Sequence, residues 1–163
     1  MTLETFCDAD GDPMQIGEYA SISRSYDETG NVILESYYGT DGEGIVLEKG
    51  YAAIHREYTP ENKVSRIEYL DLSGNPVMIT DGFAAITYDY DESGNVILEK
   101  WFNENGDQIL QKDKDYASVL KEYNDAGKVT RSTYVDFNND PVSLQDGYCM
   151  IVNEYDIAGN VIY

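Results

Sequence analysis

The segment YAAIHREYTPENKVSRIEYLDLSGNPVMITDG, residues 51–82, sets the pattern of the whole chain. It opens with an aromatic residue followed by a small one, and the same opening recurs at Tyr19, Phe83, Tyr116 and Tyr148. The steps between successive openings are 32, 32, 33 and 32 residues. A fixed period of this length is typical of proteins built from tandem structural repeats.

The aromatic residues fall into three columns of this repeat, which together hold 15 of the 20 aromatic side chains. The first column is the opening residue of each unit. The second lies seven positions later: Tyr26, Tyr58, Tyr90, Tyr123 and Tyr155. The third lies in the second half of each unit: Phe6, Tyr37, Tyr69, Trp101 and Tyr134.

Each unit is predicted to form a strand, a tight turn, a second strand and a loop. YAAIHREY (51–58) is typical of the first strand, DETGN (27–31) of the turn and VILEKWF (96–102) of the second strand. Two β-rich runs joined by a short Asp/Gly/Asn turn indicate a hairpin. Since one hairpin is marginal in water, the units are expected to gain stability by stacking on one another.

We therefore expect an all-β fold, an open solenoid-like array of about five 32-residue β-hairpin repeats. It is treated as one tandem-repeat domain over residues 1–163, in which Met1–Glu18 and Tyr148–Tyr163 are partial units. The chain begins and ends at nearly the same phase of the repeat, which is expected for a slice of a longer array. The same phase allows an alternative, a closed five-fold propeller-like ring whose termini pair.

Alternation along the first strand indicates which face is buried. Ala52, Ile54 and Arg56 fall on the side predicted to form the core, and Ala53 and His55 on a half-exposed side. The second strand gives no clear facing.

The charge of the chain narrows the choice of partners. It has 31 acidic and 11 basic residues, for a formal net charge of -20. Nucleic acid is not expected as a partner because phosphate binding needs clustered Lys and Arg, and anionic membrane surfaces are disfavoured for the same reason. No apolar run is long enough for a transmembrane helix, so no membrane insertion is expected. The N-terminal MTLETFCDADGD has no signal-peptide pattern.

Few residues suggest catalysis. Cys7 and Cys149 occupy columns that are otherwise mostly apolar, so buried free thiols are expected. His55 is the only histidine, and its column also holds Ser, Thr, Leu and Val, which indicates a tolerant surface position. No catalytic residue and no cofactor is predicted.

The segment DADGDP resembles the start of a calcium loop. An EF-hand would need glycine and glutamate where this chain has Pro13 and Tyr19, so that pattern fails. Asp8, Asp10 and Asp12 remain candidates for a weak Ca²⁺ site, although turn geometry alone explains residues of this kind.

The third aromatic column is the best candidate for ligand binding. Exposed rings stack on sugars or hold a peptide, so the column forms a candidate aromatic ladder: Phe6, Tyr37, Tyr69, Trp101 and Tyr134. The alternative is that these rings simply form the core.

Two stretches, YDETGNVILESYY (26–38) and YDESGNVILEKWF (90–102), resemble the YD repeats of bacterial Rhs-type proteins. More loosely, YYGTDGEGIVLEKGYA (37–52) resembles the cell-wall- or glucan-binding repeats of Gram-positive surface proteins. The resemblance implies a bacterial, extracellular or cell-surface tandem-repeat module. It does not identify a ligand, because Rhs units are shorter than these and choline-binding cages are rich in tryptophan.

The sequence thus favours a non-catalytic surface module that binds a glycan or a protein, or that spaces and displays other domains. A self-associating structural array joined end to end is the alternative, because open strand edges invite pairing. A hydrolase is a remote alternative, because carboxylate pairs are easily found among so many acidic residues.

Overall fold

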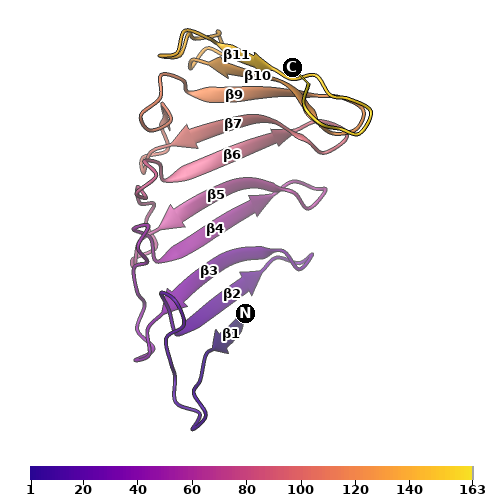
Figure 1. Ribbon diagram of the computed structural model, residues 1–163. Coiled ribbons are helices and arrows are strands. Elements are labelled where there is room, and N and C mark those ends of the chain that lie inside the picture. The colour runs from indigo at the N-terminus through magenta and orange to yellow at the C-terminus, as the bar shows by residue number, and fades with distance from the viewer. Residues whose placement is uncertain (163) are drawn as a thin grey trace. The chain divides into compact units, whose positions relative to one another are not determined.

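The computed structural model describes residues 1–162, which form strands joined by turns and loops (Figure 1). The predicted all-β fold is confirmed. Among these residues no helix is long and apolar enough to cross a membrane. The chain divides into two compact units: unit 1 comprises Met1–Ala85 and Phe102–Asp107, and unit 2 comprises Ile86–Trp101 and Gln108–Tyr163. Tyr163, the end of the predicted last partial unit, lies outside the described residues.

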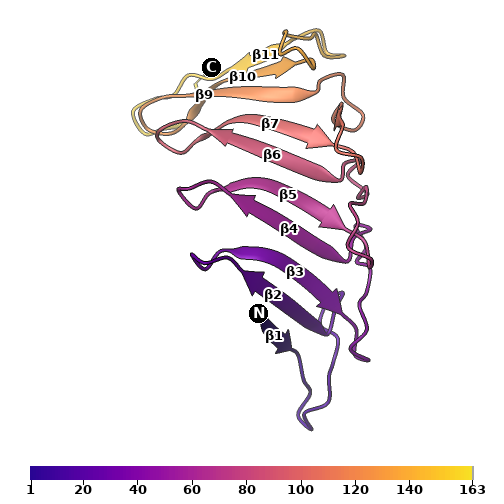
Figure 2. The same cartoon turned by 180° about the vertical axis from the view of Figure 1, so that it is seen from behind.

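Unit 1 is an antiparallel sheet whose strands follow one another in chain order. The hairpins β2–β3 and β4–β5 lie side by side through the pairing of β3 with β4 (Figures 1 and 2). Tight turns close the hairpins at one end of the strands, and longer loops connect successive hairpins at the other. The strands are β1 (Thr2–Thr5), β2 (Ser21–Tyr26), β3 (Val32–Tyr38), β4 (Ala53–Tyr58) and β5 (Val64–Leu70).

Unit 2 has the same design, with the strand order β6-β7-β9-β10-β11 and β8 paired with β7. Its strands are β6 (Ala85–Tyr90), β7 (Val96–Phe102), β8 (Gln108–Ile109), β9 (Ser118–Tyr123), β10 (Val129–Val135) and β11 (Met150–Val152). The first residue of β6 and the last of β7 belong to unit 1. Each unit is an open sheet, as predicted, and neither closes into a ring.

The hairpins share one irregularity, which explains why the facing of the second strand was hard to predict. Tyr26 pairs with Val32, but Ser25 pairs with Leu34, so Ile33 is an extra residue, a β-bulge. The same shift occurs at the equivalent positions of the hairpins β4–β5 and β9–β10. A bulge interrupts the alternation of side chains, so the bulged strand cannot be assigned to faces by counting from its start.

The core of unit 1 lies on one face of its sheet, which we call the ladder face. Ile22, Tyr37 and Ile54 project from it and are 3%, 7% and 8% exposed. Ile45 and Leu47, from the loop after β3, pack against this cluster. The opposite face, which we call the open face, is more buried near its loop end than predicted.

Burial on the open face changes along each strand. Ala53 was expected to be half exposed but is 8% exposed, while His55 is half-buried and Glu57 is exposed. Small side chains such as those of Ala53 and Ser21 are covered by neighbouring side chains on the same face of the sheet, so they have little contact with water. The predicted core side is confirmed at Ala52 and Ile54.

The loops that lead from one hairpin to the next end in a closing turn. In unit 1 the amide of Leu47 donates to the carbonyl of Tyr51 at 2.8 Å, and in unit 2 Leu144 donates to Tyr148 at the same distance. The one loop with an extra residue closes differently, because Gln111 donates to Tyr116 at 3.0 Å, one position further along. Inside that turn Asp113 has a φ of 58°, a conformation that L-residues rarely adopt.

Candidate functional site

Within each unit, the aromatic rings of the first and third columns alternate in a ladder. In unit 1 neighbouring ring centroids lie between 4.9 and 6.0 Å apart, in tilted and edge-to-face arrangements. The order of the rings is Phe6, Tyr19, Tyr37, Tyr51, Tyr69 and Phe83. Unit 2 has a ladder of Trp101, Tyr116, Tyr134 and Tyr148, with spacings between 4.8 and 6.2 Å. The five rings singled out from the sequence are therefore only half of the rings in the two ladders.

Two ladder rings are buried, and most of the others are half-buried. Tyr37 and Trp101 are each 7% exposed, so these two rings offer little surface on which a sugar could stack. Burial raises the pKa of the Tyr51 and Tyr69 hydroxyls in unit 1, and of the Tyr116 hydroxyl in unit 2. Ligand binding by the ladder stays a prediction, and its contribution to the core is what the geometry establishes.

A charged cluster lies beside the ladder in unit 1. Arg24 Nε donates to a Glu35 carboxylate oxygen at 2.8 Å, and the Tyr37 hydroxyl donates to the other oxygen at 2.6 Å. Arg56 lies 3.6 Å from the same carboxylate, and Arg24 also pairs with Glu4. Partial burial disfavours the Glu35 carboxylate, but the hydrogen bonds outweigh this penalty and hold its pKa below the ordinary value. All of these groups partner one another, so we assign the cluster a structural role.

The acidic turns are held by their own aspartates. In DADGDP the Asp8 carboxylate accepts hydrogen bonds from the amides of Asp10 and Asp12, each at 3.0 Å. In the turn after β2, Asp27 accepts bonds from the Asn31 side chain and from backbone amides, which lower its pKa to about 2. Within residues 1–162 no three His, Cys, Asp or Glu side chains are placed to hold a metal ion.

The other residues considered for chemistry lie apart from any such group. Cys7 and Cys149 are free thiols, and neither is buried as expected. Cys7 is exposed because the short strand β1 before it is exposed along its length, and Cys149 is half-buried. His55 lines a shallow hollow of about 490 Å³ at the turn ends of β2–β3 and β4–β5. Asn31 and Asn62 form a hydrogen bond there at 2.8 Å.

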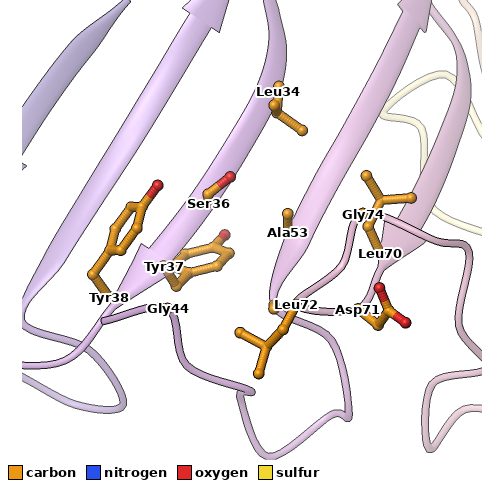
Figure 3. A pocket seen from close by; sticks show the side chains of 11 residues that line it. Leu34, Ser36, Tyr37, Tyr38, Gly44, Ala53, Leu70, Asp71, Leu72 and Gly74 are labelled. Atoms are coloured by element: carbon orange, nitrogen blue, oxygen red, sulfur yellow. The ribbon is translucent and has the colours of Figure 1, made fainter. Parts of the chain in front are cut away.

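A more enclosed hollow lies at the loop end of the open face of unit 1. It has a volume of about 190 Å³, several times the volume of one water molecule, and its lining is mostly apolar. Figure 3 shows Tyr38 on one side, Leu72 projecting from the loop after β5, and Leu34 further along β3. The principal lining side chains are Leu34, Ser36, Tyr38, Ala53, Leu70 and Leu72.

A second hollow, of about 160 Å³, occupies the equivalent place one repeat earlier. Leu3 stands there in the column of Leu34, and Ser21 in the column of Ala53. Tyr38 lines both hollows and therefore separates them. Its hydroxyl lies 3.3 Å from the Ser23 hydroxyl, which fixes the ring in place. The repeat thus produces two copies of one concave apolar site on neighbouring hairpins.

The third copy of this site is filled by the chain itself. Arg66 stands in the column of Leu34, and Phe102 in the column of Leu70. The Arg66 guanidinium lies over the Phe102 ring at 5.4 Å from its centroid, and it also pairs with Glu68 at 2.7 Å. A cation over an aromatic face is an attractive arrangement. The third copy therefore holds the guanidinium of Arg66.

Comparison with protein-family models and with curated protein sequences finds no match to this chain.

Proposed function

We propose that this chain is a non-catalytic tandem-repeat module that binds a glycan or a protein on a bacterial cell surface. The observation that carries the proposal is the recurrence of one concave apolar site on the open face of unit 1. Its two copies are neighbouring hollows, and Tyr38 lines both of them. A site that recurs with the repeat suits an extended ligand, because each added hairpin offers another point of contact. Linked contacts of this kind raise the overall affinity without any single strong site.

Contacts between hairpins within unit 1 support this role. Hydrogen bonds and the aromatic ladder hold its adjacent hairpins in register, so its open face is largely preformed before a partner arrives. A preformed surface loses less conformational entropy on binding than a flexible one. The same rigidity would serve the spacing or display of neighbouring domains.

The surface location rests on the resemblance to YD and cell-wall-binding repeats, and the charge supports it. A net charge of -20 keeps the module soluble and away from nucleic acid and anionic lipid. A non-catalytic role is favoured because the chain has a single histidine and because the hollows beside Tyr38 have a mostly apolar lining.

Binding is tested by screening the intact chain against a glycan array and against an array of bacterial surface proteins. We expect the array to retain one class of ligand, and the signal of that class to fall in the variants Tyr38→Ala and Leu72→Ser. Both residues line the first hollow, and Leu72 is 60% exposed at its rim. Tyr134→Ala and Trp101→Ala serve as tests of the ladder prediction in unit 2. The proposal fails if no glycan and no protein is retained, or if every retained partner is indifferent to Tyr38→Ala and Leu72→Ser.

A second candidate function is end-to-end self-association. The outer strands β1 in unit 1 and β11 in unit 2 are exposed at every residue, and exposed outer strands pair readily with other strands. Light scattering against protein concentration separates the two candidates. A particle mass that rises with concentration favours self-association, and a constant mass favours the binding module.

A further inference from the structure

We propose that the open face of unit 1 binds a basic, extended segment of a partner protein, whose arginine or lysine side chains enter the two hollows beside Tyr38. This inference rests on the proposed function and names the chemistry of the partner. The argument comes from comparing three copies of one site within unit 1.

In each copy, a residue of one hairpin stands across the hollow from a residue of the next hairpin. The pairs are Leu3 with Tyr38, Leu34 with Leu70, and Arg66 with Phe102. In the third pair the long arginine side chain spans the site and places its guanidinium on the ring. The two leucines are too short to do the same, so a hollow remains in each of the first two copies.

Tyr38 supplies an aromatic ring to both hollows, and its contact with Ser23 holds that ring fixed. In the second hollow Tyr38 stands in the column of Phe102, so the ring lies where the third copy has one. In the first hollow that column holds Leu70, and Tyr38 supplies the ring from β3, the strand of Leu34. A guanidinium or ammonium group from a partner would therefore meet the kind of surface that Arg66 already occupies. Arginine is favoured over lysine because its planar group stacks on rings and is more weakly hydrated.

Charge around the hollows favours a cation. The turn after β3 contributes Gly44 to the first hollow and Gly42 to the second, and it carries the exposed acids Asp41 and Glu43. Asp71 lines the first hollow, and its hydrogen bonds from backbone amides lower its pKa, so it stays ionised at neutral pH. Together with the net charge of -20, these acids would draw in a basic segment.

A glycan is the less suitable occupant of these two hollows. Their lining is mostly apolar, and the hydroxyl groups of Ser23 and Tyr38 already contact each other. A sugar needs several free polar partners, whereas the aliphatic stem of an arginine packs on apolar surface while its head group meets the ring and the acids.

The test is calorimetric titration of the intact chain with a blocked hexaarginine peptide, with blocked hexaserine as the neutral control. Two variants copy residues that already occur in neighbouring repeats, so they are expected to fold. Tyr38→Leu introduces the residue found at Leu70, and Leu34→Arg introduces the residue found at Arg66. Circular dichroism and thermal melting verify their folding.

We expect hexaarginine to bind, and Tyr38→Leu to raise its Kd about five-fold, as loss of one cation–aromatic contact implies. Leu34→Arg should raise the Kd by a similar factor because the new side chain fills the first hollow. Ile157→Arg, at a fully exposed position of unit 2, makes the same change in charge and should alter the Kd less than about two-fold. Arg66→Leu should empty the third copy and lower the Kd. Arg131→Leu removes the same charge from an exposed pair with Glu122, so it measures the effect of charge alone. The Kd should fall further in Arg66→Leu than in Arg131→Leu.

Absence of hexaarginine binding overturns the inference. A Kd of Tyr38→Leu equal to that of the wild type, together with a Kd of Leu34→Arg equal to that of Ile157→Arg, also overturns it, because the peptide would then respond to net charge alone. Either result leaves the proposed function standing if the arrays still retain a glycan or a protein. If the arrays retain nothing while hexaarginine binds with the expected pattern, the site is real and the broader function fails.

Discussion

The hydroxyl of Tyr58 donates a hydrogen bond to the backbone carbonyl of Val32, 2.8 Å away, and so joins the second hairpin of unit 1 to the first. In unit 2 the same column of tyrosines makes the same bond, from Tyr123 to Val96 at 2.6 Å and from Tyr155 to Val129 at 2.7 Å. The second aromatic column therefore joins neighbouring hairpins near their turn ends, whereas the ladder joins them near their loop ends.

Tyr58→Phe should destabilise the protein by about 1 kcal/mol, because it removes this bond and leaves the Val32 carbonyl without the hydroxyl. The measurement is the free energy of unfolding from urea titration. Tyr26→Phe is the matched control, since Tyr26 is 39% exposed and its hydroxyl contacts the exposed Thr2 side chain. Equal losses in the two variants would contradict the role assigned to the Tyr58 hydroxyl.

Glu35→Gln should destabilise the protein by about 1–2 kcal/mol, because Arg24 and Arg56 lose their shared carboxylate in a half-buried cluster. Glu122→Gln makes the same change in charge at an exposed pair with Arg131, and it should cost less than about 0.5 kcal/mol. Denaturant unfolding of both variants checks the difference. A larger loss in Glu122→Gln would refute this ranking of the two pairs.

Stability should fall in alkali. Burial raises the pKa of the Tyr37, Tyr51 and Tyr69 hydroxyls in the folded protein, so the folded state favours their neutral forms. Their contribution is fully present below the ordinary tyrosine pKa of about 10 and is lost as the pH rises through the raised values. We expect circular dichroism and tyrosinate absorbance to change together above that pH. Tyr69→Phe should flatten the dependence of stability on pH, and smooth ionisation of every tyrosine in an intact sheet would count against the burial argument.

Stability should also fall in acid. Hydrogen bonds in the turns lower the pKa of Asp27 to about 2, and they lower the pKa values of Asp71, Asp91 and Asp156 as well. The contribution of a depressed carboxyl is present above its unfolded pKa of about 4 and is lost as the pH falls through the folded value. For Asp27 the window is therefore about pH 4 to 2.

Asp27→Asn tests this directly, because asparagine already occupies the same turn position at Asn124 and its side-chain oxygen accepts the same backbone bonds. The variant should show a smaller loss of unfolding free energy than the wild type over that window. An unchanged pH slope would mean that Asp27 does not contribute to acid sensitivity.

The architecture could be predicted from the sequence because the regular spacing of aromatic residues along the chain reveals the repeat directly. The period, the hairpins and the buried positions Ala52 and Ile54 all follow from the pattern of the 32-residue repeat. The facing of the second strand did not follow, because the bulge at Ile33 breaks the alternation on which such counting depends.

The candidate site was harder to predict because it depends on pairing between neighbouring hairpins of unit 1. Leu34 meets Leu70 only through the register of β3, β4 and β5, and the position of Tyr38 between two hollows needs the same information. The sequence did contain one signal, since Arg66 and Phe102 occupy the columns of Leu34 and Leu70. Where one column changes from leucine to arginine and the facing column changes to an aromatic residue, the two side chains are expected to contact each other across neighbouring hairpins.

The closing turn between Gln111 and Tyr116 has an evolutionary consequence. The extra residue is taken up inside that turn, and the strands that follow keep the register found in the other hairpins. We therefore expect single-residue insertions and deletions at this junction to be tolerated during gene duplication and drift. Lineages of such repeats should vary in length there first, while the spacing from each opening aromatic to the tyrosine seven residues later stays constant.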